Sequence, residues 1–320
     1  MPLTLEDLYR SPDHYLHSFD GEKAIFVPMD RAAYHRSIFL DARISPAAGQ
    51  PVALPVDAVA QGIRAPQPIS WIFHMAHVGS TLLARALDDP GASLVLREPT
   101  ALRQLALQPD DRRLAIVAAM LGKRYRVDAP TLVKANVPVN FLLPKLAAMD
   151  PNARAILLYL PLRDYVLAIL RSDSHRDWLR KVTTLMADHL GDLSALSDAE
   201  RAAALWLAQA GAFSGAVNTL PNARALCAEL FFNEPAAVLN AAARHLGVPI
   251  APADIAAKVA GPLFSTHAKN PALAFDNAER VARRQDLERT MVAELDAAEE
   301  WIAERTDAPS AALTAASLSL

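Results

Sequence analysis

Apolar runs and helical repeats alternate along the central part of the chain. The run 69–75 predicts a short buried strand, and the leucines and alanines that follow Gly79 recur at the i, i+3, i+4 spacing of a helix. Alternation with short connections is typical of a parallel sheet covered by helices on both faces, so we predict an α/β fold. Further strands are predicted at 92–98, 131–137, 153–160 and 223–230, and helices at 110–124, 139–149, 164–173, 178–190, 201–213, 235–247 and 277–305.

Residues 1–68 lack this alternation and are predicted to form a small appendage. Segments 21–29 and 37–44 have the composition of strands, and the polar segment 30–36 is expected to connect them. Residues 45–68 are rich in proline, alanine and glycine, which predicts a linker or an extended strap on the main domain.

The main α/β domain is predicted to span residues 69–305. The last residues, 306–320, show no periodicity and are expected to be frayed or disordered.

Composition excludes several classes of function. A net charge of −3 over 320 residues argues against a nucleic-acid binder with a basic surface. No apolar run approaches the ~20 residues of a membrane span, and the N-terminus lacks a secretion signal pattern. The single cysteine, Cys227, excludes an intrachain disulfide framework and a cysteine-based zinc site. We therefore expect a cytoplasmic protein with neither nucleic acid nor membrane as a partner.

The turn 76–81, between the first strand and its helix, is the main candidate binding site. The first N–H groups of a helix have no intrahelical partner, and the helix dipole favours a negative charge there. Gly79 lets the backbone approach a phosphate, and Ser80 and Thr81 add hydroxyl donors. The alternative is a helix capped by Ser80 or Thr81 with no ligand. The glycine and lysine of a nucleoside-triphosphate P-loop are missing.

Polar residues also follow the next two predicted strands. Arg97 and Glu98 end one strand, and Lys134 lies near the end of the other. Ligands of open α/β sheets bind outside the carboxyl ends of the strands. We therefore expect the turn, Arg97 with Glu98, and Lys134 to lie at one site.

The segments GSTLLARAL, LVLREPTAL, LVKANVPVNFLLPKL, ARAILLYLPLRDYVLAIL and ALCAELFFNEPAAVLNAAARHLGV occur in an order that resembles the sulfotransferase family. The resemblance covers roughly residues 69–270. More narrowly, the chain resembles bacterial sulfotransferase-like proteins and the tyrosylprotein sulfotransferase branch.

This resemblance implies a P-loop-like sulfotransferase fold, with a parallel sheet flanked by helices. It also implies transfer of a sulfonyl group from the co-substrate 3′-phosphoadenosine 5′-phosphosulfate to a hydroxyl or amine of a small-molecule or peptide acceptor. No metal is implied.

The family's 5′-phosphosulfate loop corresponds to His77, Val78, Gly79, Ser80 and Thr81. His77 stands where the family has lysine or arginine, and the resemblance gives it a catalytic contact with the donor. A histidine can donate a hydrogen bond there, but it is cationic only when the anion raises its pKa. A polar loop residue without such a contact is the alternative.

The resemblance also implies contacts to the rest of the nucleotide. Arg163 matches the arginine of the 3′-phosphate site, and a guanidinium suits a phosphate, although a salt bridge near the helix start is the alternative. Ser172 matches the serine of that site one residue out of register, because Arg171 takes the expected place. His267 and Lys269 match a basic loop that closes over the nucleotide, with a solvated surface loop as the alternative.

Glu98 matches the glutamate that serves as the base in the tyrosylprotein branch, and no histidine follows Lys134 as in the other branch. Glu98 would then take up the proton of the acceptor's hydroxyl or amine. Lys134 and the loop would stabilise the charge that develops on the leaving phosphate. An ion pair of Glu98 with Arg97 or Arg85 is the alternative.

Two other functions stay open. One is a non-catalytic member that binds a nucleotide or a partner. The other is a nucleotide-dependent kinase, which the missing Gly-Lys-Ser loop and the lack of a clear magnesium-binding carboxylate disfavour.

Overall fold

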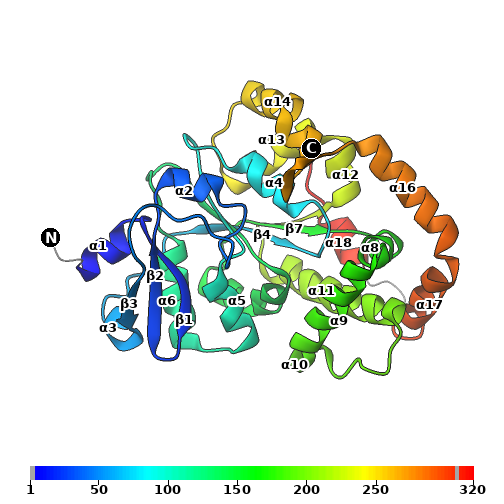
Figure 1. The fold of residues 1–320 in the computed structure, drawn as a ribbon, viewed down its shortest axis with the longest axis horizontal. Helices are drawn as coiled ribbons and strands as arrows, with labels where there is room; N and C mark the ends of the chain where they lie inside the picture. The colour runs from blue at the N-terminus through cyan, green and yellow to red at the C-terminus, as the bar shows by residue number, and fades with distance from the viewer. Residues whose placement is uncertain (1–3, 307–309) are drawn as a thin grey trace.

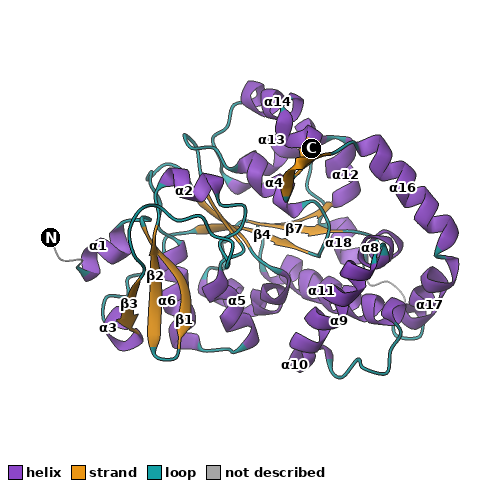
Figure 2. Cartoon of the chain, viewed as in Figure 1, coloured by secondary structure: helices purple, strands orange, loops and turns teal. Residues whose placement is uncertain are grey.

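The computed structural model, which describes residues 4–306 and 310–320, is built around a parallel sheet (Figures 1 and 2). Five strands follow the order β5-β6-β4-β7-β8, and each neighbouring pair is parallel. Every residue of β4 to β7 is buried, as expected for strands covered on both faces. The predicted α/β fold is confirmed. The strands are β4 (Ile69–His74), β5 (Leu94–Arg97), β6 (Thr131–Lys134), β7 (Ala155–Tyr159) and β8 (Ala223–Cys227).

Helices lie on both sides of this sheet (Figure 1). α4 (Ser80–Leu87) and α13 (Pro235–Leu246) pack together on one side, and α11 (Asp198–Thr219) lies on the other with η1 (Val137–Leu142) and α7 (Leu143–Met149). The other helices of this part are α5 (Thr100–Leu107), α6 (Asp111–Leu121), α8 (Leu162–Leu170), α9 (Asp173–Leu185), α10 (Ala187–Leu190), α12 (Ala228–Asn233), α14 (Pro252–Ala260) and α15 (Pro262–Ser265).

The N-terminal region forms its own antiparallel sheet, separate from the central one (Figure 2). The strand predicted over 37–44 is wrong, because this segment is irregular and its apolar Phe39 and Leu40 are buried against the end of β5. The predicted connection 30–36 instead contains a helix capped by Asp30. The elements are α1 (Leu5–Arg10), β1 (His14–Asp20), β2 (Lys23–Pro28), α2 (Arg31–Arg36), β3 (Val52–Pro55) and α3 (Val56–Ala60).

The C-terminal part departs from the sequence prediction in two places. The helix predicted over 277–305 is interrupted at Met291 and forms α16 (Asn277–Thr290) and α17 (Val292–Ala303). A short hairpin, β9 (Thr266–His267) and β10 (Asn270–Ala274), precedes it. α16 buries none of its residues and runs along the edge of the molecule (Figure 1).

The expectation of a disordered tail is wrong for residues 310–320. They contain α18 (Ala311–Ala315), bury Leu313 completely and bridge Ser317 to Ala225 at the free edge of β8. The apolar side chains of this segment are spaced too irregularly to predict a helix, but they are sufficient for this packing. Residues 307–309 lie outside the described part. Among the described residues, no helix combines the length and apolar character that crossing a membrane requires.

Arg97, the last residue of β5, fastens the N-terminal region to the central sheet. Only 1% of it is exposed, and its Nη1 donates to Asp88 Oδ2 at 2.8 Å while its Nη2 donates to the carbonyl of Ser37 at 2.6 Å. Arg31 donates to the other oxygen of Asp88 at 2.6 Å. Burial alone would raise the pKa of Asp88, but the hydrogen bond from His35 and the charges of Arg97 and Arg31 lower it to about 2. The carboxylate therefore stays ionised inside the protein.

We expect Arg97→Met to lower the free energy of unfolding by about 3–5 kcal/mol, because it removes one partner of a buried ion pair and strands the other. Urea unfolding measures this loss. Arg10→Ala is a matched control, since Arg10 forms only an exposed pair with Asp7, and a change within about 0.5 kcal/mol is expected there. Similar losses in the two variants would contradict the anchoring role of Arg97.

Candidate functional site

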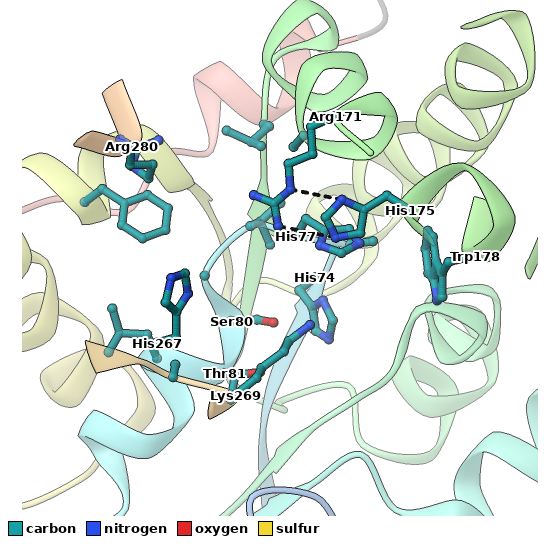
Figure 3. Close-up of a pocket in the computed structure, with 18 of the residues that line it drawn as sticks. His74, His77, Ser80, Thr81, Arg171, His175, Trp178, His267, Lys269 and Arg280 are labelled. Carbon is teal, nitrogen blue, oxygen red and sulfur yellow. Dashed lines mark hydrogen bonds between the residues drawn. The ribbon is translucent and has the colours of Figure 1, made fainter. Parts of the chain in front are cut away.

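A cavity of about 700 Å³ lies at the carboxyl ends of the central strands (Figure 3). The loop between β4 and α4 lines it, together with residues that follow β5, β6 and β7. The N-terminal region, α9, the β9–β10 hairpin and α16 supply the rest of the wall. This is the edge at which open α/β sheets bind ligands.

The loop before α4 has the conformation of an anion-binding turn. Gly79 has a φ of +76°, and a Cβ atom there would lie 2.7 Å from Cζ of Phe232, so the close approach requires glycine. α4 begins at Ser80 with no side-chain cap, so neither Ser80 nor Thr81 caps the helix as the alternative supposed. Thr81 Oγ1 is buried without a hydrogen-bond partner among the described residues. The start of α4 thus offers uncapped N–H groups to the cavity.

Glu98 and Lys134 form an ion pair at the ends of the adjacent strands β5 and β6. Lys134 Nζ donates to Glu98 Oε1, and the backbone N–H of Glu98 donates to the carbonyl of Lys134 at 2.7 Å. Lys134 is completely buried, whereas the Glu98 side chain is 19% exposed and lines the cavity. The ammonium group therefore lies behind the carboxylate and holds it at the cavity wall.

This pair replaces both ion pairs that the sequence left open for Glu98. Arg97 is occupied by Asp88, and Arg85 donates to the carbonyl of Ala268 at 2.8 Å.

The charge of Lys134 decides the protonation state of Glu98. Burial alone would raise the pKa of Glu98, but the positive charge and hydrogen bond of Lys134 outweigh burial and lower this pKa. For Lys134, burial lowers the pKa and Glu98 counteracts it. Glu98 is therefore a carboxylate at neutral pH, ready to accept a proton.

His77 is a packed neutral residue in this ligand-free structure. Its ring contacts His175 edge-on with centroids 4.2 Å apart, and Trp178 with centroids 5.5 Å apart (Figure 3). Burial, followed by the charge of Lys269, lowers the pKa of His77 to about 2. His77 thus brings no positive charge to the ligand-free loop.

His74, at the end of β4, is a hydrogen-bonded core residue. It is 5% exposed, and its Nδ1 lies 2.7 Å from the carbonyl of Met75. Because a carbonyl only accepts, Nδ1 carries the proton. Burial and the charge of Lys134 lower the pKa of His74 to about 3, so it is neutral as well.

Four cations face the cavity with no carboxylate partner among the described residues: Lys269 from the β9–β10 hairpin, Arg171 from the end of α8, Arg283 from α16 and Arg103 from α5. Figure 3 shows Lys269 extending toward Thr81 and His74. Burial and the neighbouring charge of Lys134 lower the pKa of Lys269, and burial and the charge of Arg283 lower that of Arg171. Like charges held this close favour an anionic ligand between them. His267 also lines the cavity, as the sequence suggested.

Arg163 and Ser172 lie outside the cavity. Arg163 Nη1 bonds Glu299 of α17 at 2.9 Å, and Glu288 of α16 lies 3.7 Å from its Nη2. Arg163 thus forms salt bridges, but its partners lie on other helices and not near the start of its own. Asp164, Leu167 and Ala168 of α8 and Arg171 just after it line the cavity at the i, i+3, i+4, i+7 spacing of one helical face, and Arg163 is not among the lining residues. Ser172 precedes α9 and bonds Ser174.

Sequence reasoning missed the part of the wall made by α16. Arg280, Arg283, Arg284 and Leu287 line the cavity at the i, i+3, i+4, i+7 spacing of one helical face. Arg280 bonds Glu229 at 2.7 and 2.9 Å, and Arg284 bonds Asp164 at 2.6 Å. The basic stripe is visible in the sequence, but the pattern there predicts only a helix over 277–305 and no contact with the cavity.

No protein-family model matches this sequence, and no curated protein matches it. Among solved structures, a sulfotransferase from Alicyclobacillus acidocaldarius is similar, with 14% sequence identity and a TM-score of 0.42 over 75% of this chain and 96% of that chain. The sulfotransferase domain from the curacin biosynthetic pathway is similar with 12% identity and a TM-score of 0.42, over 72% of this chain and 98% of that chain.

Likeness at this level establishes no shared activity. The narrower resemblance to the tyrosylprotein branch also finds no support in these two structures.

We expect the ring C–H resonances of His77 to show no titration between pH 5 and pH 8 in the ligand-free protein, because its lowered pKa of about 2 keeps the ring neutral throughout. Proton NMR, with His77→Phe to assign the signal, makes the measurement. A midpoint near the ordinary pKa of about 6.5 would show that the ring is solvated and free to act as the cation of the loop.

Proposed function

We propose that this protein is a sulfotransferase, which binds 3′-phosphoadenosine 5′-phosphosulfate in the cavity and transfers its sulfonyl group to a hydroxyl or amine of an acceptor. The supporting observation is that one cavity joins an uncapped helix N-terminus, cations that pair with no carboxylate of residues 4–306 and 310–320, and the Glu98–Lys134 pair. The first two suit a donor with several anionic groups, and the third suits removal of a proton from an acceptor.

The residues present fit the donor, although they differ in part from the set implied by the sequence. The N–H groups of residues 79–81, the unpartnered hydroxyl of Thr81 and Lys269 would hold the 5′ end. Arg171 and Arg283 would hold the 3′-phosphate, which the sequence assigned to Arg163 and Ser172. A phosphate between Arg171 and Arg283 relieves the repulsion of these two charges.

The donor, when bound, supplies an activated sulfonyl group. As the acceptor oxygen or nitrogen attacks sulfur, the bond between sulfur and the phosphate oxygen breaks and its electron pair stays on the phosphate. The Glu98 carboxylate accepts the proton of the attacking group, an effect typically worth about 10²–10⁴-fold. Lys134 keeps Glu98 ionised and aimed at the cavity, and Lys269 with the start of α4 meets the charge on the leaving phosphate.

One observation favours a second candidate, a protein that binds the nucleotide without transferring a group. His77 is neutral and packed against His175 and Trp178, where the family has a cation. Nucleotide binding and turnover therefore have to be measured separately.

We expect 3′-phosphoadenosine 5′-phosphate to raise the melting temperature by several degrees, whereas ATP with magnesium does not. A ligand at ~100 times its dissociation constant adds about 2.7 kcal/mol of stability. Arg283→Ala should lose most of this shift, because one of the two cations assigned to the phosphate is gone. Arg163→Ala should keep it, since Arg163 bonds Glu299 outside the cavity.

Two outcomes of the thermal-shift measurements would contradict these expectations. A larger shift with ATP would favour the kinase, and equal losses in the Arg283 and Arg163 variants would remove the assigned phosphate site.

We expect Glu98→Gln to bind the bisphosphate as the wild type does but to lose at least about 100-fold in sulfonyl transfer, because glutamine keeps the shape and cannot take up the proton. Radiolabelled transfer under saturating donor measures turnover, and calorimetry measures binding. A near wild-type rate would end the assignment of Glu98 as the base. No transfer by the wild type, despite tight bisphosphate binding, would favour the non-catalytic candidate.

A further inference from the structure

The N-terminal region forms the wall of the cavity beside Glu98. Phe39, Asp41 and Arg43 line the cavity there, together with Arg103 of α5. This segment is fixed in place, because the N–H of Leu40 donates to the carbonyl of Arg97 at 2.8 Å and Thr100 donates to the carbonyl of Leu40 at 3.3 Å. The predicted appendage is therefore part of the site.

Arg43 is held by an aromatic ring and a carboxylate. Its guanidinium carbon lies 3.8 Å from the centroid of the Phe39 ring, and its Nε donates to Asp41 Oδ1 at 2.9 Å. Burial alone would raise the pKa of Asp41, but the hydrogen bonds of Arg43 and the charges of Arg43 and Arg103 lower it. Asp41 is therefore ionised and neutralises Arg43, whose fork is pre-positioned at low entropic cost.

The charges at this end of the cavity do not cancel. Asp41 balances Arg43 and Glu98 balances Lys134, which leaves the charges of Arg103 and Lys269. Neither of these two side chains bonds a carboxylate within residues 4–306 and 310–320. The proposed donor, bound at the start of α4, balances the charge of Lys269. No part of the proposed donor balances the charge of Arg103.

We propose that the acceptor is an anionic molecule, whose carboxylate or similar anionic group binds Arg103 and Arg43 while its hydroxyl or amine faces Glu98. This assignment rests on the proposed sulfotransferase function and adds the class of acceptor. Two guanidinium groups beside the base suit a planar carboxylate through paired N–H donors. An anion here also balances the remaining positive charge of the wall, and a neutral acceptor leaves it unbalanced.

A matched pair of probes tests the charge alone. 4-Hydroxybenzoate and 4-hydroxybenzamide share the ring and the hydroxyl and differ in the negative charge. Calorimetry and ligand-observed NMR, without donor nucleotide, measure their dissociation constants. We expect 4-hydroxybenzoate to bind about tenfold more tightly, the effect of hydrogen bonds to a charged group, with the difference shrinking as salt is added.

Variants of the full-length protein then locate the charge that is responsible. Arg103→Gln should abolish the preference for 4-hydroxybenzoate and leave the melting temperature unchanged, because Arg103 bonds no carboxylate within the described part of the chain. Arg112→Gln is the matched control: this exposed arginine of α6 pairs with Asp57 away from the cavity and should keep the preference.

Several results would overturn this assignment. They are equal affinities for the two probes, no binding of 4-hydroxybenzoate at millimolar concentration, and a preference that survives in Arg103→Gln. Weaker binding of 3′-phosphoadenosine 5′-phosphate by Arg103→Gln would also overturn it, because Arg103 would then serve the donor. A preference that depends on Arg103 in a protein that does not bind the bisphosphate would leave the anionic subsite intact and remove the sulfotransferase proposal.

Discussion

Two buried positive charges at the ends of adjacent strands, those of Arg97 and Lys134, constrain the rest of this structure. A charge in the interior has to be paired and hydrogen-bonded, or it costs several kcal/mol. Arg97 meets this requirement with Asp88 and the carbonyls of α2 and its C-terminal end, and these contacts fasten the N-terminal region to the sheet. Lys134 meets it with Glu98, the residue next to Arg97. The two ion pairs therefore fix the N-terminal wall of the cavity and the carboxylate that faces it as one unit.

The elements whose apolar pattern is regular could be predicted from the sequence, and the segments that pack irregularly could not. β4 and α4 lie where the apolar run and the helical repeat placed them, because burial on both faces of a parallel sheet leaves a continuous apolar signal. Residues 37–44 carry apolar side chains but no strand, since only Leu40 forms a backbone–backbone hydrogen bond with β5, and no ladder forms. Similarly, the contacts of residues 316–318 with β8 depend on an edge that only the folded sheet provides.

The candidate site shows the same division at the level of single side chains. The loop 76–81, Glu98 and Lys134 meet at the cavity edge because parallel strands end together, which the order of the elements is enough to predict. Arg163 and Arg171 are both arginines of the β7–α8 region, and the rotation of one helix directs only Arg171 into the cavity. Likewise, the packing of His77 against α9 and the pairing of α16 with α8 and α12 are tertiary contacts that no local pattern encodes.

Backbone strain gives an independent reason to regard this edge as functional. Within the described residues, His77 and Glu98 alone among the non-glycine residues have positive φ, +61° and +58°, and both line the cavity. Each such residue costs about 1–3 kcal/mol unless the surroundings compensate. Neither strain is required by the sheet, because both residues follow strands that have already ended. At Glu98 the compensation is the bond to Lys134 and the backbone hydrogen bond to its carbonyl, which turn the carboxylate toward the cavity. At His77 the strained turn brings Gly79 beneath Phe232 and leaves the start of α4 uncapped. Both distortions thus present a polar group to the same cavity, in agreement with the proposed sites for an anionic donor and its acceptor.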